Sequence, residues 1–140
     1  MDPKEAYTYL QIAQDQLSDA ELAFKNERYA LCVFLAASSA ENATSAWLIA
    51  LGAQPSKKHR NSLVLKKLAE SSSVELKASL IEAIKSMQEL EPHITKARYP
   101  IRRDLELLPP SKFYTKEKAE ESLARAEYVV KLVQRKIKME

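Results

Sequence analysis

Apolar residues recur at helical spacing along most of this chain. In residues 3–25 they follow alternating steps of four and three and so form one stripe: Ala6, Leu10, Ala13, Leu17, Ala20 and Phe24. Asp2 can cap this first helix, and Pro3 fits its first position. In residues 28–51 apolar side chains cover most of the circumference, which predicts a second helix in the middle of a bundle or in an oligomer interface. Gly52 is placed to end this helix in the left-handed conformation.

The next two helices are separated by serine-rich and polar links. Residues 53–61 form a polar, basic connection, and residues 62–70 suit a short third helix. Ser72, followed three residues later by Glu75, is typical of a capping box and predicts the start of a fourth helix there.

Prolines divide the last third of the chain. Pro92 can kink the fourth helix, which can then continue to about Ala97, and Pro100 prevents it from going further. Residues 100–114 contain no strand pattern, so we predict a loop. Thr115 is placed to cap a last helix with one apolar stripe.

These elements predict an all-α fold, an up-and-down bundle of four long helices plus one short helix. We expect a single domain over residues 1–140, with both termini at the same end of the bundle because the number of long helices is even. The sequence holds one glycine and many alanines, leucines, glutamates and lysines, which favours long helices over tight turns.

Charge is distributed unevenly along the chain. The formal net charge is +3, but residues 1–27 hold six acidic and two basic residues, whereas residues 52–140 hold 12 acidic and 19 basic residues. This distribution fits either an ordinary solvated surface or a basic face for an anionic ligand.

Composition excludes several classes of site. The only cysteine, Cys32, lies in an apolar run and cannot form a disulfide within the chain, so we expect a buried, inert thiol. One cysteine and two histidines do not make a zinc cluster, and one glycine does not make a phosphate-binding glycine loop. We expect no cofactor. The polar N-terminus and the short apolar runs predict a cytoplasmic protein that binds no membrane.

The richest candidate for ligand binding surrounds Pro100. Arg98, Arg102 and Arg103 offer planar, paired donors that suit phosphate oxygens, and Tyr99 or the more distant Tyr114 can stack on a base. The alternatives are that the arginines pair with carboxylates of the same chain and that the tyrosine beside Pro100 packs against the bundle.

A second basic segment precedes the short helix. Lys57, Lys58 and His59 can add ligand contacts, and His59 can serve as a general base or simply as an exposed loop residue. Glu41 is the single acid of the apolar second helix and needs a partner. Either Arg98 or His59 could pair with it, which would make Glu41 a structural anchor for the basic loop.

Several weak motifs follow one another in a specific order along nearly the whole chain. They are an alanine-rich first helix with Ala13, Leu17, Ala20 and Ala23, the break Asn26-Glu27-Arg28-Tyr29, the helix over residues 36–43 that ends near Gly52, His59 with Leu63 and Leu68, the run Ala97-Arg98-Tyr99-Pro100, and the entry Phe113-Tyr114-Thr115 into the last helix. In this order and spacing, the chain resembles the HEPN domain family (higher eukaryotes and prokaryotes nucleotide-binding).

The resemblance implies an all-α bundle, usually a homodimer, that often pairs with a small nucleotidyltransferase in toxin–antitoxin-like modules. Some members are metal-independent RNases whose active site resembles an arginine followed a few residues later by a histidine. Arg98 matches that arginine, but the histidine position falls among Arg103, Asp104 and Leu105. The resemblance therefore favours a chain that is not an enzyme.

Three functions remain open from the sequence. The favoured one is a non-catalytic module that binds a nucleotide or a nucleic-acid phosphate and docks a nucleotidyltransferase. The second is an RNase toxin in which Arg98 stabilises developing charge and His59 removes a proton from a 2′-hydroxyl. The third is a purely structural dimerisation domain, suggested by the wide apolar surface of the second helix.

Overall fold

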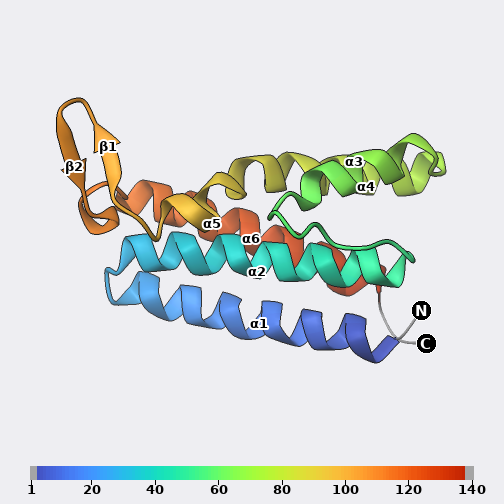
Figure 1. The fold of residues 1–140 in the computed structure, drawn as a ribbon. Helices are drawn as coiled ribbons and strands as arrows, with labels where there is room; N and C mark the ends of the chain where they lie inside the picture. Colours follow the sequence, from blue (N-terminus) through green and yellow to red (C-terminus); the bar gives the residue numbers. More distant parts are fainter. Residues whose placement is uncertain (1–2, 138–140) are drawn as a thin grey trace.

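The computed structural model describes residues 3–137, and most of them are helical (Figure 1). In chain order the elements are α1 (Pro3–Lys25), α2 (Tyr29–Ala50), α3 (Asn61–Glu70), α4 (Val74–Leu90), α5 (Pro92–Lys96), β1 (Ile101–Arg103), β2 (Glu106–Leu108), a 3-10 turn (Pro110–Lys112) and α6 (Lys116–Lys136). The predicted all-α bundle of four long helices and one short helix is confirmed, with α5 as a further short helix after the proline kink. No helix within residues 3–137 is long and apolar enough to span a bilayer.

The second helix is the centre of the bundle. It contacts α1, α3, α4, α5 and α6, and α1, α2 and α6 run side by side (Figure 1). This position explains why apolar residues cover most of its circumference. The hydroxyl of Tyr7 donates to the carbonyl of Ile137 at 3.4 Å, so the start of α1 and the end of α6 lie at the same end, as predicted.

The predicted caps of α2 and α6 are confirmed. Gly52 has a φ of 84°, its N–H donates to Ile49, and the N–H of Ala53 donates to Leu48, which is the pattern of a Schellman motif. The hydroxyl of Thr115 accepts from the N–H of Lys118 at 3.1 Å. Asp2, the predicted cap of α1, lies outside the described residues.

The prediction that Ser72 caps α4 is wrong by one residue. Ser73 is the cap, and its hydroxyl accepts from the N–H of Leu76. The Ser72 hydroxyl instead donates to the carbonyl of Leu68 at 2.6 Å and closes the end of α3. Two adjacent serines therefore serve two different helix ends, which the spacing to Glu75 alone does not resolve.

The prediction of a strand-free loop over residues 100–114 is also wrong. β1 and β2 form an antiparallel hairpin in which Ile101 pairs with Leu108, and this hairpin projects beyond the end of the bundle (Figure 1). Strands of three residues are too short to show an alternating pattern. The turn uses Asp104 with a φ of 55°, a conformation that aspartate tolerates better than most residues.

Candidate functional site

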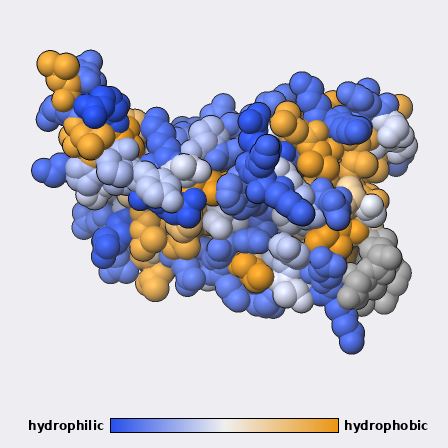
Figure 2. All heavy atoms as spheres, in the orientation of Figure 1, coloured by the Kyte–Doolittle hydropathy of each residue, from blue (hydrophilic) through white to orange (hydrophobic). Residues whose placement is uncertain are grey.

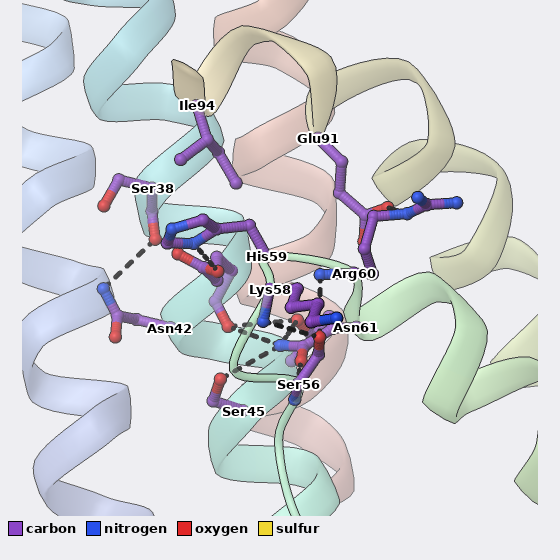
Figure 3. Close-up of polar contacts among 12 residues, drawn as sticks. Ser38, Asn42, Ser45, Ser56, Lys58, His59, Arg60, Asn61, Glu91 and Ile94 are labelled. Atoms are coloured by element: carbon purple, nitrogen blue, oxygen red, sulfur yellow. Dashed lines mark hydrogen bonds and ion pairs between the residues drawn. The ribbon is translucent and has the colours of Figure 1, made fainter.

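The basic loop between α2 and α3 is fastened to the middle of α2 by Asn61. This side chain is fully buried, and its carbonyl oxygen accepts from the N–H of Ser56 at 2.9 Å. Its amide group donates to the Glu41 carbonyl and to the hydroxyls of Thr44 and Ser45, at 3.1, 2.9 and 3.0 Å (Figure 3). These bonds make the loop double back, so that its last residues lie over α2.

The fold-back brings His59 onto Glu41. The Nδ1 atom of His59 lies 2.6 Å from Oε2 of Glu41, and the His59 backbone has a left-handed φ of 59°. Because an ionised carboxylate only accepts hydrogen bonds, Nδ1 is the donor, and in the neutral ring Nε2 keeps its lone pair. Of the two partners considered for Glu41, the structure brings His59 into contact and leaves Arg98 apart.

A second carboxylate, Glu91, lies where α4 meets α5. Its two oxygens accept from the N–H and the hydroxyl of Ser62 at 2.7 and 2.6 Å, and Nε of Arg60 lies 4.0 Å away. Burial raises the pKa of the Glu91 carboxyl above its ordinary value, against the lowering effect of these hydrogen bonds. Because Ser62 lies in the first turn of α3, Glu91 satisfies an N–H that has no partner inside that helix.

The loop and Glu91 together border a hollow of about 390 Å³. Lys58, His59 and Arg60 line one side of this hollow, and Thr95 of α5 lines another. Three basic side chains at one opening suit an anionic ligand.

Arg98 lies just beyond the end of α5. Its Nε donates to the carbonyl of Ile94 at 2.8 Å, and its guanidinium carbon lies 5.3 Å from the ring centre of Phe34 and 5.4 Å from that of Tyr99. The side chain also lines a hollow of about 500 Å³ beside Arg28. One donor thus fixes the guanidinium, and no group within residues 3–137 accepts a hydrogen bond from its terminal nitrogens.

Within residues 3–137, none of the ion pairs involves an arginine of the Pro100 segment. The basic partners in these pairs are His59, Arg60, Lys118, Arg125 and Lys131. The alternative in which Arg98, Arg102 and Arg103 are neutralised by carboxylates of their own chain therefore finds no support in the described part of the structure.

His59 and Arg98 lie above one face of α2 but are not in contact. Their partners on that helix, Glu41 and Phe34, are seven residues apart, which places them on the same face about 10 Å apart along the axis. The site is therefore an elongated strip on one side of α2, with an imidazole in one part and a guanidinium in the other.

Comparison with known proteins agrees with this fold. The family model described as "HEPN domain" matches residues 6–136. The chain belongs to the HEPN domain family. The crystal structure of TT1696 from Thermus thermophilus is similar to this HEPN chain, with a TM-score of 0.71 and 25% sequence identity, and the match covers 94% of this chain and 98% of that chain. No curated protein matches the chain.

The remaining predicted site residues of this HEPN domain lie in different places. Arg102 and Arg103 are on β1 of the projecting hairpin, and Lys57 lines a separate hollow of about 750 Å³ between α1 and the loop. Tyr99 is 54% exposed next to Arg98, so it does not pack against the bundle as one alternative expected.

Two other titratable groups of the HEPN domain, a half-buried histidine and a buried tyrosine, form a structural pair. Nδ1 of His93 lies 2.7 Å from the hydroxyl of Tyr114. Burial, followed by nearby Lys118 and Lys96, lowers the pKa of His93 to about 4, and burial raises the pKa of Tyr114 to about 12. This pair ties α5 to the start of α6, and Tyr114 is not free to stack on a base.

Sequence reasoning did not identify Asn61, Glu91 and Arg60. Asn61 follows the basic loop directly, and Glu91 is an acid next to Pro92, but neither position has a motif that marks it. Their roles depend on the loop doubling back over α2, which brings together residues up to 29 positions apart.

Proposed function

We propose that this HEPN domain is a non-catalytic module that binds a nucleotide or a nucleic-acid phosphate. Arg98 carries the proposal, because its exposed guanidinium is positioned by the Ile94 carbonyl and by Phe34 and has no carboxylate partner within residues 3–137. A guanidinium in this state can present paired donors to phosphate oxygens. The exposed ring of Tyr99 beside it suits a base.

The other basic residues extend the proposed binding surface in two directions. Lys58 and His59 lie along α2 at the smaller hollow, and Arg102 and Arg103 lie on the hairpin. Such a spread of cations fits a ligand longer than one phosphate, so a short RNA should bind more tightly than ATP or GTP.

Equilibrium titration tests this function. We expect wild-type protein to bind a short RNA at low salt, with affinity falling as salt rises. Arg98→Ala should weaken binding about tenfold to 100-fold, because hydrogen bonds to charged groups are lost. Arg135→Ala removes the same charge from an exposed position at the end of α6 and should change binding little. Absence of binding to ATP, GTP and RNA, or equal effects of the two variants, would rule the function out.

We also propose that the domain forms a homodimer and pairs with a nucleotidyltransferase in a toxin–antitoxin-like system. Membership of the HEPN family supports this pairing. A nucleotidyltransferase reading frame beside this one, whose product co-purifies with the chain when both are expressed, is the expected finding. A monomeric chain that does not bind this product would contradict the proposed homodimer and pairing.

A second candidate function is RNA cleavage, and the contact between Glu41 and His59 favours it. A carboxylate that holds Nδ1 leaves Nε2 able to take a proton, and Arg60 lies beside the same hollow. However, Arg98 lies two helical turns away from this pair, so the two groups do not converge on one phosphate in a single subunit.

Incubation of the purified protein with RNA and a chelator separates the two functions. We expect the RNA to stay intact, because the strip along α2 separates the base from the guanidinium. Cleavage by wild-type protein that His59→Ala abolishes would establish the second function instead. In that case Glu41→Gln should also slow cleavage, since it replaces the carboxylate that orients Nδ1.

A further inference from the structure

The projecting hairpin carries apolar side chains that the bundle does not use. Leu105 at its turn is 97% exposed, and Leu107 on β2 is 56% exposed. Leu107 pairs with Arg102 across the strands, so both side chains lie on the same face of the hairpin. The other face holds Ile101, which is buried against the bundle. Figure 2 shows orange, hydrophobic atoms at the tip of this projection. We call residues 101–108 the hairpin arm.

The outer face of α1 has the complementary character. Ile12 and Leu22 are 40% and 61% exposed, and Asp15 and Asp19 are exposed between them. Their spacing places all four within an arc of about 80° on the helix. Neither aspartate forms an ion pair within the described residues. We call these four residues the acidic stripe.

We propose that the hairpin arm of one subunit docks on the acidic stripe of a second copy of this chain. The arm offers leucines and a cation, and the stripe offers apolar side chains and two anions, so charge and hydrophobicity match on both surfaces. Because one chain carries both halves, a pair with two-fold symmetry makes the contact twice. Exposed leucines on a projecting element are typical of a surface that another molecule covers.

This inference rests on the homodimer proposed above and adds to it the surface through which the copies join. It also gives part of the acidic N-terminal segment a role, since Asp15 and Asp19 would face Arg102 of the hairpin arm across the interface. Docking would assign Arg102 to the dimer contact and remove it from the extended ligand surface proposed above, which would then consist of Arg98, Arg103 and the loop at α2.

Sedimentation velocity over about 1–100 µM tests the docking by mass action. We expect the wild-type chain to dimerise and the double variant Leu105→Ser, Leu107→Ser to raise the dimer dissociation constant about tenfold to 100-fold. Both leucines are exposed, so the variant should keep the wild-type helix content and melting temperature, which circular dichroism checks.

Charge reversal locates the surface on the partner. Arg102→Glu should weaken the dimer, and adding Asp15→Arg and Asp19→Arg to the same chain should restore it. Lys66→Glu is the control, because the same charge change then falls on an exposed position of α3, outside the hairpin arm and the acidic stripe, and should leave the dimer nearly unchanged.

The possible outcomes separate this inference from the proposed homodimer. A wild-type chain that stays monomeric overturns both. A dimer that the leucine variant leaves intact, or that Arg102→Glu weakens without rescue, overturns the docking alone. If the leucine variant still dimerises but no longer binds RNA, the hairpin arm is a nucleic-acid contact, and this result also overturns the docking.

Discussion

Asn61→Leu is expected to lower the free energy of unfolding by about 2–4 kcal/mol, because leucine fills a similar space but makes no hydrogen bonds. In the wild-type chain the fully buried Asn61 side chain accepts a hydrogen bond from the Ser56 N–H and donates to the hydroxyls of Thr44 and Ser45. Each buried group that loses its partner costs about 1–3 kcal/mol. Urea unfolding followed by circular dichroism measures the change.

Asn42→Leu is the matched control for this substitution. Asn42 is half-buried, and its amide donates to the Gln16 side chain and to the Ser38 carbonyl. Water can replace these partners, so we expect a loss below about 1 kcal/mol. Equal losses for the two variants would show that Asn61 does not hold the loop through its buried hydrogen bonds.

Asn61→Leu should also change the candidate site. Asn61 fastens the basic loop to α2, and His59 contacts Glu41 from this attached loop. In Asn61→Leu the basic loop should therefore no longer contribute to ligand binding. Arg98 is held by α5 and α2, so its contribution to binding should stay unchanged. Titration of RNA against the variant, under conditions where it is folded, separates the two contributions.

The helices could be predicted from the sequence because their determinants are local. Apolar side chains repeat at helical spacing, and Gly52 and Thr115 end or begin helices through bonds to neighbours within a few residues. The two errors have different causes. The capping-box spacing to Glu75 selects Ser72, although the adjacent Ser73 is the cap. The hairpin depends on an isoleucine that reaches the bundle from a strand of three residues.

The candidate site could be predicted only as a list of residue types. The pattern singled out guanidiniums, lysines and an imidazole that suit phosphate, and their roles in binding stay predictions. Their arrangement depends on contacts between distant segments. The loop doubles back over α2, which brings His59 into contact with Glu41. The imidazole therefore lies about two helical turns from Arg98 along α2. No local spacing encodes that separation.

Glu91→Ala is expected to destabilise the chain by about 2–4 kcal/mol at neutral pH, since it leaves both the N–H and the hydroxyl of the buried Ser62 without a partner. The loss of stability should affect mainly the first turn of α3, where Ser62 lies. Glu89→Ala, an exposed glutamate near the same end of α4, is the control and should change stability by less than about 0.5 kcal/mol. Urea unfolding measures both variants, and a small effect for both would contradict the capping role of Glu91.

The pH dependence of the Glu91 contribution follows from its burial. Burial raises the pKa of this carboxyl above the ordinary value of 4.5, so the folded chain holds the proton more tightly than the unfolded chain. The part of its contribution that depends on protonation is then fully present below that ordinary pKa and is lost as the pH rises through the folded pKa, whereas the hydrogen bonds from Ser62 remain. The difference in unfolding free energy between wild-type protein and Glu91→Gln, whose side chain does not titrate, should therefore shrink between pH 4.5 and neutrality. A difference that grows over this range would mean that the hydrogen bonds from Ser62 and the charge of Arg60 outweigh burial, and that Glu91 is held in its ionised form.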